Sequence, residues 1–248
     1  MPVIAWMAAA FLVTAMLYAS VGFGGGSTYA ALLALGGMDY RALPMVALAC
    51  NIVVVAGSTL RFARSGLVPW KGALLLTGIA APAAFLGGLT PIGEGAFFTL
   101  LGAALVLTGL SLFLPRANDN GERGRAARFM PLAAAPLGYL AGLVGIGGGI
   151  FLAPLLHLTR WDGARRIAAT ASLFILINSL FGLAGQVLKR GPEVLGGAIG
   201  FALPLMIAVA IGGQVGSLLA TRILPLAAIR WLTAALTIYV GARLLAGV

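Results

Sequence analysis

The sequence predicts an all-α protein that crosses a membrane several times and consists of two homologous repeats. Three observations lead to this fold class: an apolar composition, a series of apolar runs of bilayer-spanning length, and a glycine-rich motif that occurs twice. The composition indicates that the protein is surrounded by lipid, the apolar runs predict the membrane-spanning helices, and the repeated motif divides the chain into two halves.

The composition is typical of a membrane protein. The 248 residues are 61% hydrophobic and 9% charged, with a mean hydropathy of +1.06. Soluble domains are about 45–50% apolar and about 25% charged, so this chain needs lipid as its main solvent. The net charge of +10 would suggest a nucleic-acid partner for a soluble protein. Here the cations lie between apolar runs, where they set the topology, and no nucleic-acid partner is expected.

The glycine-rich motif has the sequence Val-Gly-X-Gly-Gly-Gly, and its two copies at 21–26 and 144–149 are 123 residues apart. At this offset, 11 of the 23 positions from Leu17 to Asp39 are identical to their counterparts. A motif and a downstream aspartate that both recur in register indicate an internal duplication.

The first half contains four runs of spanning length and one short piece. A spanning helix needs about 20 mostly apolar residues. The first run ends at the glycine motif, and the nine apolar residues after the motif are too few to cross. Two glycines and Asp39 close this piece, and a basic loop and a Thr-Pro-Ile-Gly-Glu turn separate the later runs. In order, the runs are 2–20, 27–35, 42–60, 72–89 and 96–114.

The second half repeats this order after a hydrophilic connector at 115–128, which contains four arginines and the turn-forming sequence Asn-Asp-Asn-Gly. We therefore assign the two repeats to 1–114 and 129–248. Two GxxxG spacings, Gly196/Gly200 and Gly212/Gly216, predict close helix packing. The runs of this half are 129–144, 150–158, 167–188, 194–220 and 224–245.

The orientation of the repeats depends on whether each glycine-broken segment crosses the membrane. If it crosses, each half has four spans and the repeats are parallel, a reading that the length of 2–20 supports. If it is a re-entrant hairpin, each half has three full crossings and the repeats are inverted. Four basic segments, holding 12 of the 16 cations, then share one side. The positive-inside rule favours this inverted arrangement, with both termini outside.

The two glycine breaks are the predicted binding site. Three consecutive glycines are costly in a helix, so we expect unwound backbone with free N–H groups. Paired interruptions in two membrane repeats indicate a transporter site at the repeat interface, and exposed helix N-termini attract anions. Polar side chains beside the breaks or in the following spans complete the site. The candidate substrate-binding residues are Gly24, Gly25, Gly26, Ser27, Asn51, Gly147, Gly148, Gly149 and Asn178.

The sequence argues against an enzyme and against a membrane-embedded proton carrier. All six acidic residues lie in or beside loops, and the single histidine, His157, lies near the end of the second short piece. No P-loop lysine or nucleophile elbow is present, which leaves Ser27 with His157 as the weak candidate pair of an intramembrane protease. We expect no metal and no cofactor. The alternative to a transporter is a non-transporting membrane scaffold.

The doubled glycine break, the short apolar helix that ends near an aspartate and the length of about 250 residues resemble the sulfite exporter TauE/SafE family, also called the toluene sulfonate uptake permease family. The resemblance covers essentially the whole chain. It implies a multi-pass carrier of the bacterial inner membrane for small anions, commonly sulfite, sulfonates or related organosulfur compounds. One departure is Ala31 in the first half where the second half has Pro154, so the two halves of the site are expected to differ.

The expected mechanism follows from the residues at the breaks. Two helix ends that meet near the bilayer midplane would together offer about one positive charge to a small oxyanion. Without a titrating acid in the spans, we expect facilitated diffusion or anion exchange, with sodium coupling through unwound carbonyls as the alternative. The expected partners are therefore a small anion and the lipid bilayer, and a homodimer is compatible with these features.

Overall fold

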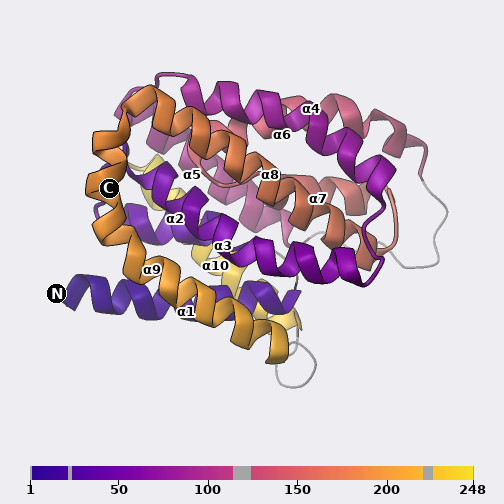
Figure 1. Ribbon diagram of the computed structural model, residues 1–248, viewed down its shortest axis with the longest axis horizontal. Coiled ribbons are helices and arrows are strands. Elements are labelled where there is room, and N and C mark those ends of the chain that lie inside the picture. Colours follow the sequence, from indigo (N-terminus) through magenta and orange to yellow (C-terminus); the bar gives the residue numbers. More distant parts are fainter. Residues whose placement is uncertain (1, 22–23, 114–123, 220–225, 248) are drawn as a thin grey trace.

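The computed structural model describes residues 2–21, 24–113, 124–219 and 226–247, and within them the chain is helical without strands (Figure 1). Gly22, Phe23 and most of the predicted connector lie outside the described residues. The elements are α1 (Pro2–Val21), α2 (Gly26–Leu35), α3 (Leu43–Arg64), α4 (Trp70–Leu89), α5 (Glu94–Ser111), η1 (Arg125–Phe129), α6 (Met130–Val144), α7 (Gly149–Leu158), α8 (Ala164–Arg190), α9 (Pro192–Leu219) and α10 (Leu226–Leu245).

Six helical segments within the described residues are long and apolar enough to cross a bilayer. Several helices extend further than the apolar runs predicted, because they include cations at their ends. Arg61 and Arg64 lie in the last turn of α3, and Lys189 and Arg190 lie in that of α8. Long cationic side chains can reach the interface while the backbone remains helical, so charge does not end these helices. The six segments are 43–64, 70–89, 94–111, 125–144, 164–190 and 196–216.

The start of α6 differs from the sequence prediction. Residues 125–129, which lie mainly in the predicted connector, form the 3-10 turn η1 and lead into α6 without a break. Ala127 is buried in the same cluster as Leu76 and Met130, while Arg125 and Arg128 are exposed. Burial of one apolar side chain therefore extends the helix into a segment whose arginines suggested a connector.

The helix α2 folds back along α1. The rings of Phe11 and Tyr29 stack with centroids 4.7 Å apart, and the hydroxyl groups of Tyr18 and Thr28 are 2.8 Å apart. At the far end of α2, a Cβ on Gly36 would lie 2.8 Å from Cε of Met7. Successive positions of α2 therefore meet earlier positions of α1, which makes the pair an antiparallel hairpin.

The helices α3 and α8, one from each half, cross at the centre and are antiparallel. Gly182, near the end of α8, faces Leu48, near the start of α3. A Cβ atom added at Gly182 would lie 3.5 Å from Leu48 Cδ1. In the opposite direction, the hydroxyls of Thr59 and Ser172 are 2.9 Å apart. The pair α5 and α10 is antiparallel as well, because Gly102 meets Gly241 while Gly109 meets Ala234.

Two further helix pairs, α1 with α9 and α4 with α6, pack closely through glycines. Gly212 and Gly216 lie on the carbonyl groups of Leu12 and Met16 in α1. This confirms the packing predicted for the second GxxxG spacing. The prediction for Gly196 and Gly200 is wrong within the described chain, because no heavy atom lies within 4 Å of a Cβ built at either position.

The pair α4 and α6 uses the same kind of contact. Gly138 and Gly142 of α6 lie on the carbonyl groups of Ala80 and Ala84 in α4. The later glycine of α6 contacts the later alanine of α4, so α4 and α6 run parallel. Their N-termini consequently lie at one end of the molecule, together with the start of α8 (right-hand side of Figure 1).

Candidate functional site

The two glycine breaks interrupt the helices as predicted, but the third glycine of each triplet is helical. Gly24 and Gly25 lie outside the helices, and α2 begins at Gly26. In the second break, Gly147 and Gly148 have φ of +77° and +76°, a left-handed conformation that side chains rarely adopt. The helix α7 then begins at Gly149, the counterpart of Gly26. Unwinding explains the first two glycines of each triplet, and close packing explains the third.

The N-cap residue of each short helix supplies no side-chain hydrogen bond to the first turn. The N-cap residues are Gly25 and Gly148, which have no side chain to accept a hydrogen bond from the first turn. The first backbone bond of α2 runs from Tyr29 N–H to Gly25 O, at 2.8 Å. The earlier amides of a helix have no acceptor within it, so these two N-termini retain donors and a partial positive charge.

Asn51 of α3 lies between the two breaks. Its Nδ2 donates to the carbonyl of Ile146 in the second break, at 3.2 Å. Gly26 packs directly on the same amide, and a Cβ there would lie 2.6 Å from Ile146 O. Asn51 is fully buried, and its Oδ1 has no partner among the described residues. The two breaks are therefore in contact with each other, with one asparagine amide at their junction.

Ser179 of α8 is a functional candidate that the sequence reasoning missed. A Cβ at Gly147 would lie 2.9 Å from Ser179 Oγ and 2.8 Å from Asn51 Nδ2, so both polar groups line the second break. The Ser179 hydroxyl is buried and has no partner in the described structure, as is the case for Ser27 Oγ. A short serine in an apolar helix gives little signal, and only its proximity to the predicted Asn178 could have pointed to it.

Asn178 is fully buried in α8, and neither of its amide atoms has a partner among the described residues. It is not among the nearest atoms at any of the predicted site glycines. Adjacent helical residues point about 100° apart, so Ser179 and Asn178 face different neighbours. Ser179 is therefore the α8 side chain beside the second break, while the role of Asn178 stays a prediction.

A second group of hydroxyls continues along the α3–α8 contact. Ser172 Oγ lies 3.2 Å from Ser58 Oγ and 2.9 Å from Thr59 Oγ1, and all three residues are buried. Unlike Ser179, these hydroxyls are hydrogen-bonded to one another. The contact between α3 and α8 thus has a hydrogen-bonded polar part, whereas Asn51 Oδ1 and Ser179 Oγ at the breaks have no partner among the described residues.

Charged groups lie away from the breaks. Among the described residues, the one ion pair joins Arg166 to Asp162 at 3.7 Å, outside the helical core. His157 lies in the last turn of α7, about 12 Å along the helix from its start at the break. No group of three metal-ligating side chains occurs in the part of the chain that the structure describes. The available donors at the junction are therefore backbone amides, an asparagine amide and serine hydroxyls.

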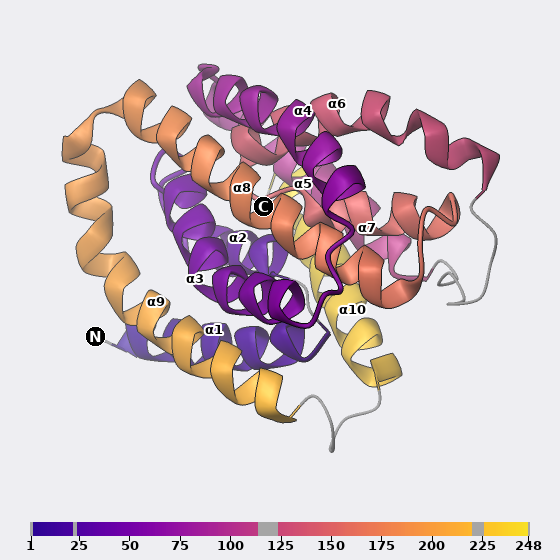
Figure 2. The same cartoon turned by 45° about the vertical axis from the view of Figure 1, so that its right-hand side comes forward.

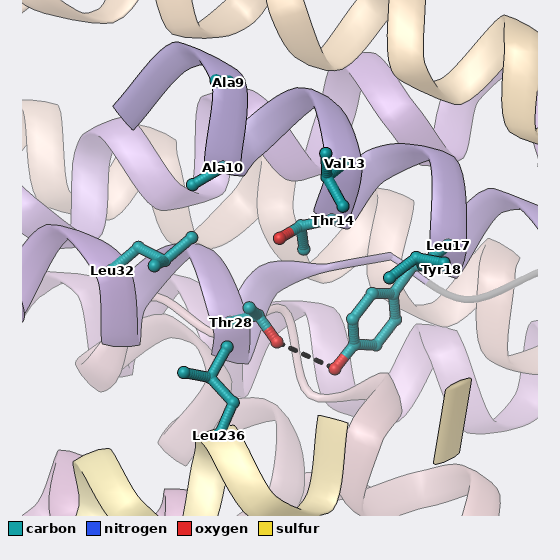
Figure 3. Close-up of a pocket in the computed structure, with 9 residues that line it drawn as sticks. All are labelled: Ala9, Ala10, Val13, Thr14, Leu17, Tyr18, Thr28, Leu32 and Leu236. Atoms are coloured by element: carbon teal, nitrogen blue, oxygen red, sulfur yellow. Dashed lines mark hydrogen bonds between the residues drawn. The ribbon is translucent and has the colours of Figure 1, made fainter. Parts of the chain in front are cut away.

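A cavity of about 390 Å³ opens beside the first break, between α1, α2 and α10 (Figure 3). Most of its lining is aliphatic, and the hydroxyl-bearing side chains of Thr14, Tyr18 and Thr28 supply the polar part. The cavity adjoins the break because a Cβ at Gly25 would lie 3.1 Å from Thr14 Cγ2. It gives the first break a neighbouring space that the sequence did not predict.

Comparison with known proteins gives a family and several relatives. Residues 7–244 match the family described as "Sulfite exporter TauE/SafE". The chain is 33% identical over 245 residues to the probable membrane transporter protein y4hK of Sinorhizobium fredii, covering 96% of this chain and 97% of that one. It is 24% identical over 199 residues to the probable membrane transporter protein YunE of Bacillus subtilis, covering 70% and 71% of the two chains.

A plant relative matches a shorter part of the chain. Sulfite exporter TauE/SafE family protein 1 of Arabidopsis thaliana is 39% identical over 95 residues, which is 38% of this chain and 21% of that one. No solved structure matches. Since the family match covers almost the whole chain and is one of membrane transporters rather than enzymes, the protein belongs to the sulfite exporter TauE/SafE family.

Proposed function

We propose that the protein is a secondary transporter or facilitator that moves small oxyanions across the bacterial inner membrane, and that the two glycine breaks form its binding site. The proposed substrates are sulfite, organosulfonates and related carboxylates. The observation that carries the proposal is the position of Asn51, whose amide lies between two uncapped helix N-termini. The family membership and the name of the plant relative support a sulfur oxyanion.

The chemistry of the junction favours an anion over a cation or a proton. Two helix N-termini contribute about half a positive charge each, which suits a monovalent oxyanion. Buried hydroxyls without partners, such as those of Ser27 and Ser179, can donate to oxygen atoms once an anion arrives. A site made of such donors holds its ligand without a buried cation, whose solvation in the membrane would be costly. It can therefore bind an anion and still release it.

The absence of acidic side chains at the junction supports transport down the substrate gradient. Proton-coupled carriers use carboxylates or histidines within their spans. The carboxylates of the described chain lie at helix ends, for example Glu94 at the start of α5 and Asp162 before α8. We therefore propose facilitated diffusion or anion exchange, and sodium coupling through the unwound carbonyls is the second candidate.

Inverted repeats are part of the proposal, and the helix contacts support them. The central pair α3 and α8 is antiparallel, and so is the pair α5 and α10. A two-fold axis that exchanges antiparallel spanning helices lies in the membrane plane, which is the relation between inverted repeats. The hairpin of α1 and α2 supports the same arrangement, because α2 returns toward the side from which α1 entered.

The distribution of cations supports an orientation for these repeats. Among the described side chains, the end that holds the start of α4, α6 and α8 carries eight exposed cations, against four exposed or half-buried ones at the opposite end. The positive-inside rule then makes this basic end cytoplasmic and places both termini outside. The eight are Arg61, Arg64, Lys71, Arg125, Arg128, Arg160, Arg165 and Arg166.

The test is solute flux into proteoliposomes that contain the purified protein. Sulfite, a short alkyl sulfonate and two- and three-carbon carboxylates are compared with a cation and a neutral solute of similar size. The proposal expects flux of at least one oxyanion and none of the cation or neutral solute. Flux of the cation or neutral solute without any anion flux would contradict it. A complete absence of flux would instead favour the scaffold alternative.

A further inference from the structure

The two short helices end in the same backbone motif but with different residues at its left-handed position. At the end of α2, the N–H groups of Gly37 and Met38 donate to Ala34 O and Leu33 O, both at 3.0 Å, and Gly37 has φ of +70°. At the end of α7, Arg160 takes the position of Gly37, 123 residues later. Its N–H donates to His157 O at 3.1 Å, and its φ is +47°.

An arginine at this position is unfavourable for the backbone. Left-handed residues that end helices are usually glycine, since a Cβ crowds the neighbouring carbonyl. Arg160 is the one described non-glycine residue with positive φ. The first half shows that glycine supports the same motif. Backbone strain of this kind concentrates at functional sites, so the arginine side chain itself needs an explanation.

Arg160 lies beside the exposed cations of η1. Its carbonyl accepts a hydrogen bond from Gly124 N–H at 3.3 Å, and Gly124 directly precedes Arg125. The indole of the next residue, Trp161, packs on Gly72, where an added Cβ atom would lie 2.6 Å from the ring. Lys71 directly precedes Gly72 and therefore lies in the same region as Arg160. Arg125, Arg128, Arg160 and Lys71 are all exposed, and none has an ion-pair partner among the described residues.

Among the described residues, few negative charges lie beside this cluster, which we call the α4–α6 basic cluster (Lys71, Arg125, Arg128 and Arg160). Neither α4 nor α6 has an acidic residue in its first turn. The adjacent carboxylate of Asp162 accepts from Gly163 N–H at 2.7 Å and pairs with Arg166. The N-termini of α4 and of η1, which leads into α6, therefore lie beside cations that have no ion-pair partner among the described residues, and their backbone dipoles also favour an anion.

Large apolar side chains border the cluster on the bilayer side. Trp70 is 49% exposed at the start of α4, and Phe129 is 53% exposed at the start of α6. The guanidinium of Arg128 lies 4.7 Å from the centre of the Phe129 ring. Leu132, one turn further into α6, is 75% exposed. Aromatic rings at the interface and aliphatic groups beyond them are typical of a lipid-facing surface. Figure 2 brings this end of the molecule forward.

We infer that the α4–α6 basic cluster binds the headgroup of an anionic phospholipid, with the acyl chains lying along Trp70, Phe129 and Leu132. Cations at two helix N-termini, without an ion-pair partner among the described residues, match the phosphate, and the exposed apolar side chains beside them match the acyl chains. A free phosphate would use only the first of these features. The site is separate from the glycine breaks, and it explains why an arginine occupies the position that glycine holds in the other half.

The test measures lipid binding to the full-length protein in detergent by native mass spectrometry. Dioleoyl phosphatidylglycerol, dioleoyl phosphatidylcholine and glycerol phosphate are compared. We expect the anionic lipid to bind at least tenfold more tightly than the zwitterionic lipid, and glycerol phosphate not to compete. Each cation near a membrane surface contributes a several-fold gain in affinity, so Arg125→Gln/Arg128→Gln should weaken anionic-lipid binding at least tenfold.

Arg160→Gly separates a lipid role from a structural one. It restores the residue that the first half uses, so its unfolding temperature should not fall, whereas its anionic-lipid affinity should drop several-fold. The matched control Arg41→Gln/Arg243→Gln removes two exposed cations from the opposite end and should bind lipid as wild type does. Equal binding of both lipids, competition by glycerol phosphate, or full lipid affinity in Arg160→Gly would each overturn the inference.

Discussion

At the level of single residues, the junction of the breaks leaves no room for larger glycine substitutions. A Cβ at Gly24 would lie 2.8 Å from Val55, and one at Gly25 would lie 2.7 Å from Tyr29. The left-handed φ of Gly147 and Gly148 adds backbone strain to any substitution there. Loss of function in a glycine variant would therefore not separate a binding role from a packing role. Polar side chains at the junction are better probes.

The serine at the second break provides the first prediction. Ser179→Ala removes a buried hydroxyl that has no described partner, so folding should change little. A hydrogen bond to a charged group contributes about 1.5–3 kcal/mol, so the apparent affinity for the transported anion should fall about tenfold or more. Concentration-dependent flux in proteoliposomes measures this change.

The control for Ser179→Ala is Thr108→Val, which removes another buried hydroxyl without a described partner. Thr108 lies in the last turn of α5, outside the junction. Its removal should leave the apparent affinity within about twofold of wild type. Equal losses in both variants would mean that the flux assay reports general packing, and an unchanged Ser179→Ala would remove Ser179 from the site.

At the level of elements, the sequence predicted the α-helices but only a few of the contacts between them. The apolar runs predicted each α-helix, and bilayer thickness separated the spans from the two short pieces, whereas the 3-10 helix η1 lay mainly in the predicted connector. The glycine triplets predicted the breaks, but whether a glycine unwinds or packs depends on its neighbours in space. Gly26 and Gly149 are helical for this reason. Asn51 could be predicted from the sequence because it is an amide inside an apolar run. Ser179 could not, because its position beside the second break results from the way α8 crosses α3.

The two GxxxG spacings of α9 provide the second prediction, because only one of them packs. Gly216→Ala would place a methyl group on the backbone of Met16, so it should destabilise the protein by about 1–3 kcal/mol. Gly200→Ala meets open space and improves helix propensity, so it should be neutral or stabilise by up to about 1 kcal/mol. Thermal unfolding in detergent measures both variants. A stability change of the same sign and size in both would contradict the described α1–α9 packing.

At the level of the whole molecule, the proposed inverted topology predicts which ends of the helices share a side. Cysteine substitutions at Ser65, after α3, and at Glu94, at the start of α5, should react with a membrane-impermeant thiol reagent from opposite sides. Both positions are exposed, and the native Cys50 is buried, so background labelling should be low. Ser65→Cys should be labelled only from the cytoplasm.

Two outcomes of the labelling experiment would contradict the topology. Labelling of both positions from the same side would mean that α4 does not cross the membrane. Periplasmic labelling of Ser65→Cys would reverse the orientation and leave the cations of the basic end outside, against the positive-inside rule. The bacterial inner membrane as the location and a homodimer as the oligomeric state stay predictions.

The central claim is that the two breaks form one anion site around Asn51. The most direct test compares Asn51→Asp with Asn178→Asp in sulfonate flux at neutral pH, since both residues are buried asparagines of the same shape. A carboxylate at the junction would repel the anion, so Asn51→Asp should lose at least about 90% of the flux. Asn178 is not among the atoms nearest the site glycines, so folded Asn178→Asp should keep most of the flux, and this comparison also tests the substrate-binding role predicted for Asn178. If the charged variant does not fold, Asn51→Ala replaces it. Wild-type flux in the Asn51 variant, or equal losses in the two Asp variants, would contradict a site at the breaks.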